Sequence, residues 1–463
     1  MNRKQTIILI SATAILVLGV VGFLLYTGRV PILQTIGIFP GEGQPVPPKP
    51  GEEEEEVNIP IFIPGVNNGA SFPQLYELHK VPVAGVGLVE TDANVSSSGA
   101  SKTKKAGATS SVPRAIAVRY LERGLGHIYE TSLATLIETR IVNETRPRII
   151  EAFFGNKGNS VAVRSLEEKD ESEFIKTRIL NMGASASSTA FFKTEEVTLP
   201  DHIPFMAAAE DGANAFFYLT SGLTSAAGSL ITSKGAHTGI FSSSFTEWLP
   251  QFPNQNLVTI TTRPSSSVPG YLFFLNTKTK ALTKILDGVN GLTTKTNRSG
   301  TLVLYSQTGS EGTPELFVYD MAQRESRLLT LKTLPEKCAW SVKEAAVAYC
   351  AVPQTLPSAV YPDQWYRGTV SFSDSVWKID TVAGRVEKIF TPAALRAPEL
   401  DIINPVLSSD DSSLVFMNKI SGTPWVYRIV MPPPQAVAAT TTLPVTTIAP
   451  SSDIGTEGMV KIK

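Results

Sequence analysis

The run T-L-V-L-Y-S at residues 301–306 alternates apolar side chains with small or polar ones, as a half-buried β-strand does. The same six-residue pattern recurs along the chain, with further copies that begin at residues 115, 160, 214, 256, 345 and 413. Successive copies start 45, 54, 42, 45, 44 and 68 residues apart. Seven copies near a spacing of 44 residues indicate a repeat, and a repeat of about this length built from short strands is typical of a β-propeller blade.

Each repeat contains more than one strand. A turn rich in Gly, Asp, Asn or Ser precedes most copies, and a second alternating strand such as E-L-F-V-Y-D at 315–320 follows most of them. Four short strands per repeat predict one four-stranded blade each. We therefore expect an all-β fold, a single propeller over residues 71–430 with seven blades. Six blades is the alternative, if the divergent second repeat (166–200) or the seventh repeat is misread.

The seventh repeat lacks an outer strand, because P-P-P follows its third strand and proline cannot continue a hydrogen-bonded ladder. The segment Q-L-Y-E-L-H-K-V-P at 74–82 matches R-L-L-T-L-K-T-L-P at 327–335, which stands just before another inner strand. We expect residues 73–80 to supply the missing strand, which would join the two ends of the domain and leave no free sheet edge.

Several motifs resemble the TolB-like and WD-repeat-like propellers of bacteria, namely W-S-V-K-E at 340–344, L-F-V-Y-D at 316–320 and D-T-V-A-G-R at 380–385. Residues 82–155, from P-V-A-G-V-G to A-F-F-G, are similar to uncharacterised bacterial proteins with one N-terminal membrane anchor and a propeller ectodomain. These motifs are turn and strand residues. The resemblance therefore implies a fold and carries over no functional residue.

The N-terminal region predicts a membrane anchor. Between Lys4 and Arg29 lie 24 uncharged residues, long enough as a helix to cross a hydrocarbon layer of about 30 Å. The basic residues before them favour an N-terminus inside the cell. We expect a cytoplasmic N-terminus at 1–4 and a transmembrane signal anchor at 5–28, so that the protein is single-pass in the cytoplasmic membrane with the propeller outside. A cleaved signal peptide is the alternative.

Two further segments differ from the propeller in composition. Residues 29–70 contain P-V-P-P-K-P-G and five consecutive glutamates, which predict an extended Pro/Glu-rich stalk. Residues 431–463 are rich in Pro, Thr and Ala and predict a disordered tail.

Charge and motif content exclude several function classes. The 463 residues include 41 Lys and Arg against 42 Asp and Glu, so the net charge of −1 argues against a nucleic-acid binder. The four histidines show no metal-ligand spacing, and neither a G-x-S-x-G elbow nor a phosphate-binding Gly-Lys-Ser/Thr loop occurs. We therefore nominate no catalytic, cofactor-binding or metal-binding residue, and expect no cofactor.

The sixth repeat carries an insertion at 351–374, between its second and third strands. It contains Tyr361, Trp365, Tyr366 and Arg367, the residue types that dominate binding hot spots. Either these side chains form a binding surface or they fold back and seal the tops of the blades.

Cys338 and Cys350 flank the predicted hairpin of the same repeat. An exported location would allow a disulfide between them. Direct opposition would require a bulge or a loop of odd length, and two buried free thiols are the alternative.

These observations favour a protein-binding or scaffolding module of the bacterial cell envelope, with another envelope protein as partner. The alternative is an envelope glycan-binding protein, or a carbohydrate-active hydrolase or lyase with paired carboxylates at the propeller channel.

Overall fold

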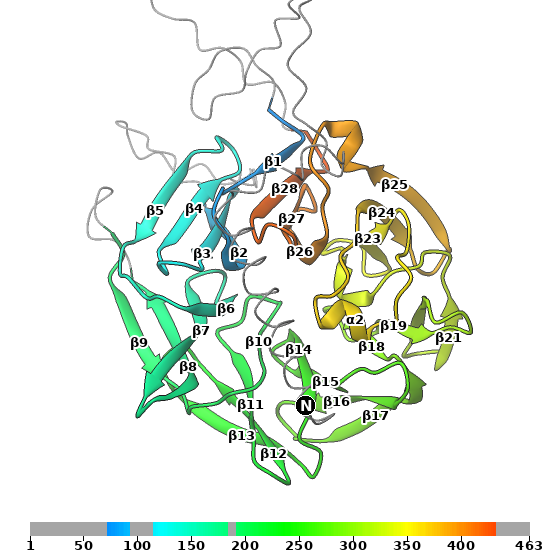
Figure 1. Cartoon of the computed structure of the whole chain (residues 1–463), viewed down its shortest axis with the longest axis horizontal. Helices are drawn as coiled ribbons and strands as arrows, with labels where there is room; N and C mark the ends of the chain where they lie inside the picture. The colour runs from blue at the N-terminus through cyan, green and yellow to red at the C-terminus, as the bar shows by residue number, and fades with distance from the viewer. Residues whose placement is uncertain (1–71, 93–113, 184–190, 432–463) are drawn as a thin grey trace, which may run out of the picture. The chain divides into compact units, whose positions relative to one another are not determined.

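The computed structural model describes residues 72–92, 114–183 and 191–431 (Figure 1). The expected anchor at 5–28, the stalk at 29–70 and the tail from residue 432 onward lie outside these residues. Within the described ranges, no helix has the length and apolar character needed to cross a membrane.

Seven four-stranded antiparallel sheets follow one another around a ring, which confirms the expected all-β, seven-bladed propeller (Figure 1). We number them sheet 1 to sheet 7 in chain order. Sheet 1 contains β2 (Val83–Asp92), β3 (Arg114–Glu122), β4 (Ile128–Ser132) and β5 (Glu138–Val142). Sheet 2 contains β6 (Ile149–Gly155), β7 (Ser160–Lys169), β8 (Ser172–Met182) and β9 (Thr194–Thr198). Sheet 3 contains β10 (Met206–Ala208), β11 (Phe216–Ser221), β12 (Ala226–Ile231) and β13 (His237–Ser243).

Sheet 4 contains β14 (Trp248–Asn254), β15 (Leu257–Thr262), β16 (Pro269–Asn276) and β17 (Leu282–Asn290). Sheet 5 contains β18 (Thr293–Thr296), β19 (Leu302–Thr308), β20 (Pro314–Asp320) and β21 (Glu325–Leu328). Sheet 6 contains β22 (Cys338–Trp340), β23 (Val347–Pro353), β24 (Asp374–Asp380) and β25 (Arg385–Phe390). Short helices stand in the connections around sheet 6: η2 (Pro335–Lys337), α2 (Asp363–Tyr366) and η3 (Pro392–Leu395).

Sheet 7 closes the ring with strands from both ends of the domain. It contains β26 (Ile402–Leu407), β27 (Ser413–Asn418), β28 (Pro424–Arg428) and, as its outer strand, β1 (Leu75–Glu77). Leu75 pairs with Tyr427 and Glu77 with Trp425 in antiparallel register. The expected closure by residues 73–80 is therefore confirmed.

The core lies between neighbouring sheets. Each second strand is packed on both faces, and all six residues of β27 are buried. One cluster joins sheets 6 and 7 through Tyr349, Phe390 and Trp425, and comparable clusters join the other sheets. Near the axis the inner strands β2 and β6 come very close, since a Cβ built on Gly85 would lie 2.0 Å from the carbonyl oxygen of Ala152. Only glycine fits at that position of β2.

Strand direction gives the ring two distinct faces. Neighbouring strands of a sheet run in opposite directions. The connections between successive sheets, which lead into each first strand, therefore lie on the same side of the ring as the loops that join each second strand to the third. We call this side the upper face. Hydrogen bonds between such connections agree, as from Val83 N to Gly422 O (2.9 Å) and from Arg146 N to Leu125 O (2.7 Å). By the same alternation, the described chain enters at Phe72 and leaves at Met431 on the lower face.

Candidate binding site on the upper face

The insertion of the sixth repeat (residues 354–373) connects β23 to β24 on the upper face and contains α2. It contacts three other sheets. Asp363 accepts a hydrogen bond from Ser266 N beside sheet 4 (2.8 Å), and the carbonyl of Tyr361 accepts one from Thr308 Oγ1 of sheet 5 (3.0 Å). Lys419, beside sheet 7, donates to the carbonyls of Trp365 (2.9 Å) and Val370 (3.1 Å). The insertion thus spans the upper ends of sheets 4 to 7.

Two of the four predicted binding residues face inward. Tyr361 is 1% exposed and Trp365 is 7% exposed, and both pack with Leu334 and Phe372 in a small apolar cluster beneath the insertion. In this structure they fold back onto the blades and are not available to a partner. Tyr366 is 42% exposed and Arg367 is exposed, so the candidate surface is reduced to these two residues.

Tyr366 and Arg367 are held differently. The Tyr366 hydroxyl donates to the carboxylate of Glu336, in the connection that leads into sheet 6. This hydrogen bond ties the exposed ring to the propeller. Within the described part of the chain, the Arg367 guanidinium has no hydrogen-bond or ion-pair partner, so its donors are free to bind a ligand.

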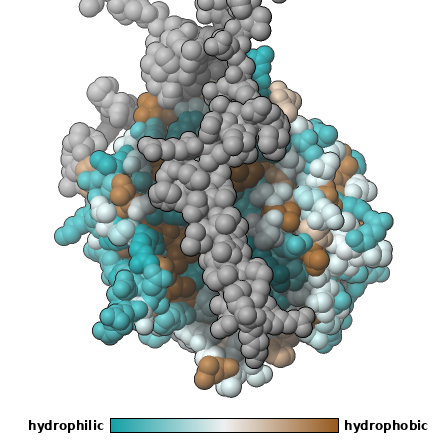
Figure 2. Space-filling view, viewed as in Figure 1, coloured by the Kyte–Doolittle hydropathy of each residue, from teal (hydrophilic) through white to brown (hydrophobic). Residues whose placement is uncertain are grey.

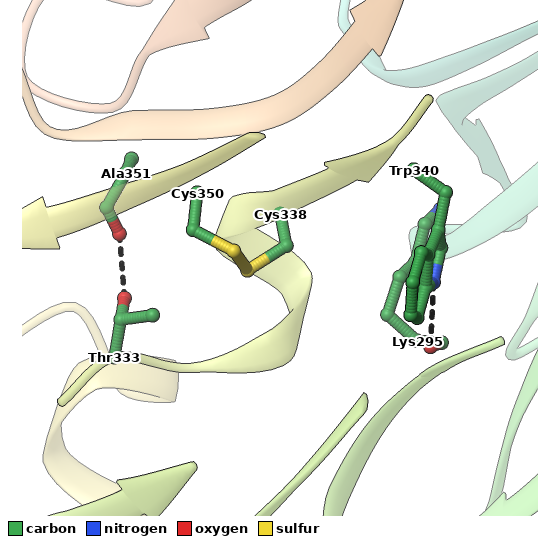
Figure 3. Close-up of a disulfide and its surroundings, with 6 residues drawn as sticks. All are labelled: Lys295, Thr333, Cys338, Trp340, Cys350 and Ala351. Carbon is green, nitrogen blue, oxygen red and sulfur yellow. Dashed lines mark hydrogen bonds between the residues drawn. A yellow bond between two sulfur atoms is a disulfide. The ribbon is translucent and has the colours of Figure 1, made fainter. Parts of the chain in front are cut away.

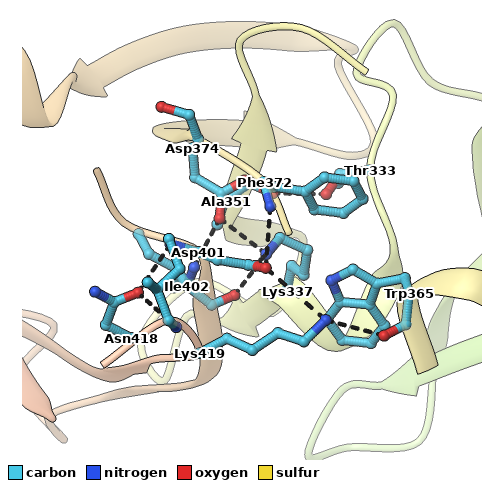
Figure 4. A network of polar contacts seen from close by, with 12 residues as sticks. Thr333, Lys337, Ala351, Trp365, Phe372, Asp374, Asp401, Ile402, Asn418 and Lys419 are labelled. Atoms are coloured by element: carbon cyan, nitrogen blue, oxygen red, sulfur yellow. Dashed lines mark hydrogen bonds and ion pairs between the residues drawn. The ribbon is translucent and has the colours of Figure 1, made fainter. Parts of the chain in front are cut away.

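Beneath the insertion lies an ion-pair cluster that the sequence did not reveal (Figure 4). Lys337, at the end of η2, has a fully buried side chain whose Nζ lies 2.8 Å from Asp374 Oδ2 and 2.6 Å from Asp401 Oδ1. Both aspartate side chains are also fully buried. The carbonyl of Ile402 accepts a further hydrogen bond from Lys337 Nζ (2.8 Å). The cluster joins three separate connections of the upper face.

Aromatic rings enclose this cluster. Lys337 Nζ lies 5.0 Å from the ring centroid of Phe372 and 5.5 Å from that of Trp365. Lys419 Nζ lies 4.4 Å from the same indole ring and 3.9 Å from Asp401 Oδ2. Cation–π contact with two ammonium groups accounts for the inward orientation of Trp365.

Burial governs the charge states here. It raises the pKa of Asp374 to about 6, although the neighbouring Lys337 ammonium opposes the shift. Asp374 Oδ1 is buried without a hydrogen-bond partner. Burial also lowers the pKa of Lys419, against the opposing effect of Asp401. The carboxylates of Asp374 and Asp401 have no solvent-exposed surface, so a glycan cannot contact them in this structure.

Cys338 and Cys350 are joined by a disulfide in the structure (Figure 3). They lie directly opposite each other on β22 and β23, with Cα atoms 4.0 Å apart. Seven residues, 341–347, separate the paired residues Trp340 and Ala348. Because this number is odd, Cys338 and Cys350 can lie directly opposite each other. Both cysteines are fully buried.

Two grooves lie where a connection passes beside the sheet that it enters. A groove of about 600 Å³ lies between residues 330–332 and sheet 6, where Val352, Trp377 and Lys388 line it, and the Lys388 ammonium lies 4.8 Å from the Trp377 ring centroid. A second, of about 390 Å³, lies between residues 145–147 and sheet 2. Its lining residues Arg178 and Glu196 pair with each other at 2.7 Å.

The closure of the ring also holds a polar group that sequence reasoning missed. His79 Nδ1 lies 2.6 Å from Glu138 Oε1, and the hydroxyl of Tyr120 donates to the same carboxylate. No sequence spacing could have found this group, since its members are up to 59 residues apart. Its place between β1 and sheet 1 indicates a structural role. Among the residues that the structure describes, no group of three or more His, Cys, Asp or Glu side chains could hold a metal ion.

Comparison with known proteins finds similar solved structures but no matching family. No protein-family model matches the chain, and no curated protein matches it. Among solved structures, an oligogalacturonate lyase in complex with manganese is 11% identical, with a TM-score of 0.45, over 69% of this chain and 86% of that one. TolB from Acinetobacter baumannii is 13% identical, with a TM-score of 0.38, over 68% of this chain and 76% of that one.

A third similar structure is the β-propeller domain of Cps50 (Swd1) from Myceliophteria thermophila. It is 8% identical, with a TM-score of 0.41, over 68% of this chain and 94% of that domain. All three TM-scores lie below 0.5, so the seven-bladed fold rests on the strand order of this chain and not on these likenesses. At these identities the likeness concerns fold, and no site residue is carried over.

Proposed function

We propose that this protein is a membrane-anchored, extracytoplasmic propeller that binds another protein of the bacterial cell envelope through its upper face. The observation that carries the proposal is the set of exposed apolar side chains that the upper-face connections carry around the ring. The upper-face connections contain Val81, Leu125, Leu223, Phe245, Val268, Val360, Tyr366 and Ile420, all exposed. Exposed apolar and aromatic side chains beside an unpaired arginine are the composition of a protein interface.

The arrangement of the chain ends supports the same face. The described chain enters and leaves on the lower face, opposite the upper-face connections. In the space-filling view, apolar residues appear as separate spots among polar ones (Figure 2). A specific interface must bury about 1,000 Å² or more, which requires several of these connections together.

The disulfide supports the location. A buried Cys338–Cys350 bond forms and persists in an oxidising compartment, which an exported propeller would occupy. The anchor at 5–28 lies outside the described residues and is part of the proposal. A protease-protection assay on intact cells tests it, because a propeller degraded only after the cytoplasmic membrane is opened would contradict an external location.

Site-specific photo-crosslinking of the full-length protein in intact membranes tests the binding face. A crosslinker at Tyr366 or Arg367 should capture a discrete protein. One at Val382, which is 53% exposed in a lower-face turn, is the matched control. Equal capture from both faces would refute the assignment of the upper face. Absence of any protein adduct would refute a protein partner, and a glycan-binding screen would then test the alternative.

A further inference from the structure

The buried cluster around Lys337 has the geometry of a reactive site. One ammonium group and two carboxylates meet at 2.8 and 2.6 Å, and all three side chains have 0% exposure. Ion pairs at such distances are ordinary on protein surfaces, where water keeps both partners ionised. Here burial places an amine against a carboxyl group without access to solvent, and Figure 4 shows the aromatic side chains that surround them.

Burial changes what these groups can do. An amine attacks a carboxyl carbon when the amine is neutral and the acid is protonated, and a low-dielectric environment favours both neutral forms. Holding the two groups in contact replaces a bimolecular encounter by an intramolecular one, with effective molarities on the order of 10⁵ M or more. A third group must accept the proton that the ammonium loses, and the second carboxylate is in place for this.

We propose that Lys337 and Asp374 are joined by an intramolecular isopeptide bond, formed with Asp401 as the proton acceptor. The two aspartates differ in ways that assign these roles. Asp374 accepts a hydrogen bond from Ile402 N at Oδ2 (2.7 Å), but its Oδ1 is buried without a partner, and burial raises the pKa of this carboxyl to about 6, toward the neutral form. Both oxygens of Asp401 have partners: Oδ1 accepts from Lys337 Nζ (2.6 Å), and Oδ2 accepts from Phe372 N (3.0 Å) and lies 3.9 Å from Lys419 Nζ.

The reaction balances without any co-reactant. Asp401 takes one proton from the Lys337 ammonium, and the neutral Nζ attacks Cγ of protonated Asp374. The Nζ–Cγ bond forms, the bond from Cγ to the hydroxyl oxygen breaks, and that hydroxyl leaves as water with a second proton from Nζ. The products are a secondary amide, one water and a protonated Asp401. No electron is transferred, and the net charge of the three groups is zero before and after.

The bond would give sheet 6 a second covalent link beside the disulfide. Lys337 directly precedes Cys338 at the start of β22, and Asp374 begins β24. The amide would therefore tie the start of the inner strand to the far end of the insertion. It would fix the insertion at its base and leave Tyr366 and Arg367 exposed.

Peptide mapping of the full-length wild-type protein, denatured, reduced and alkylated, tests the proposal. Trypsin does not cleave after an acylated lysine, so residues 333–343 should stay in one piece, joined to residues 368–378. The expected mass is the sum of these two peptides less about 18 Da, one water. Because the measurement uses the wild-type chain after denaturation, no variant has to fold.

Each outcome decides the matter. Separate peptides 333–337 and 368–378 at their full masses would overturn the proposal and leave a non-covalent ion pair. A link from Lys337 to residues 397–419, which contain Asp401, would overturn the assignment of Asp374. Asp401→Asn should abolish or strongly slow the linkage, and efficient linkage in that variant would refute its role as base. Lys337→Arg, which keeps the positive charge, should give no link.

Discussion

Replacing Cys338 and Cys350 by alanine, singly and together, measures what the disulfide contributes to sheet 6. Each single variant loses the bond and one sulfur, whereas the double variant loses the bond and both sulfurs. The sum of the two single effects, less the double effect, therefore isolates the bond itself. The cysteines are 12 residues apart, and the chain-entropy relation gives about 3 kcal/mol for a closed loop of this length.

Hydrogen exchange measured by mass spectrometry is the suitable assay, because it reports opening of the β22–β23 hairpin and not unfolding of the whole ring. A coupling of about 3 kcal/mol corresponds to roughly a hundredfold faster exchange, since each 1.4 kcal/mol is tenfold. Amides of sheet 3 serve as the internal reference and should not change. A coupling below about 1 kcal/mol would refute the entropic reasoning for this hairpin.

Three further perturbations separate structural causes. Gly85→Ala should lower the unfolding free energy by about 2–3 kcal/mol, because the added Cβ would clash with the β6 backbone. The control is Gly239→Ala, whose Cβ would meet nothing closer than 4.0 Å and which should change the unfolding free energy by less than about 0.5 kcal/mol. Urea unfolding compares the two variants, and equal losses would contradict the packing explanation. Trp365→Ala should lower the local stability of the insertion by about 3–5 kcal/mol and speed amide exchange across 354–373. Unchanged exchange there would show that the Trp365 indole does not stabilise the insertion. Burial raises the pKa of Tyr361 to about 12, whereas the pKa in the unfolded chain is near 10. The stability that this hydroxyl contributes is therefore complete below pH 10 and is lost as pH rises through 12. The difference in unfolding free energy between the wild type and Tyr361→Phe should shrink between pH 10 and 12, and a constant difference would refute the shift.

The architecture could be predicted because its signals are local and repeated. Alternation within six residues gives each second strand, and all seven expected copies fall on β3, β7, β11, β15, β19, β23 and β27. Alternation does not mark a strand boundary where small residues stand. β12 (Ala226–Ile231) begins with Ala226, Ala227 and Gly228, which pair with β11 although they show no alternation of apolar and polar side chains.

The details of the upper face could not be predicted, because composition does not fix orientation. Tyr361 and Trp365 have the chemistry of a binding hot spot and equally that of a buried cluster. Their tertiary contacts decide between the two: Trp365 faces Lys337 and Lys419, and Tyr361 packs against Phe372. Lys337 and Asp401 come from two different connections, 64 residues apart. Their meeting depends on the ring bringing neighbouring sheets together, which no spacing along the chain encodes.

The way the ring is closed also determines how it would respond to mechanical force. β1 and β28 are antiparallel neighbours, and the chain leaves both of them at the same end of the pair. Tension between Phe72 and Met431 would therefore pull this ladder apart like a zipper, breaking its hydrogen bonds one after another and not all at once. With only three residues in β1, sheet 7 is the seam at which a stretched propeller would open first.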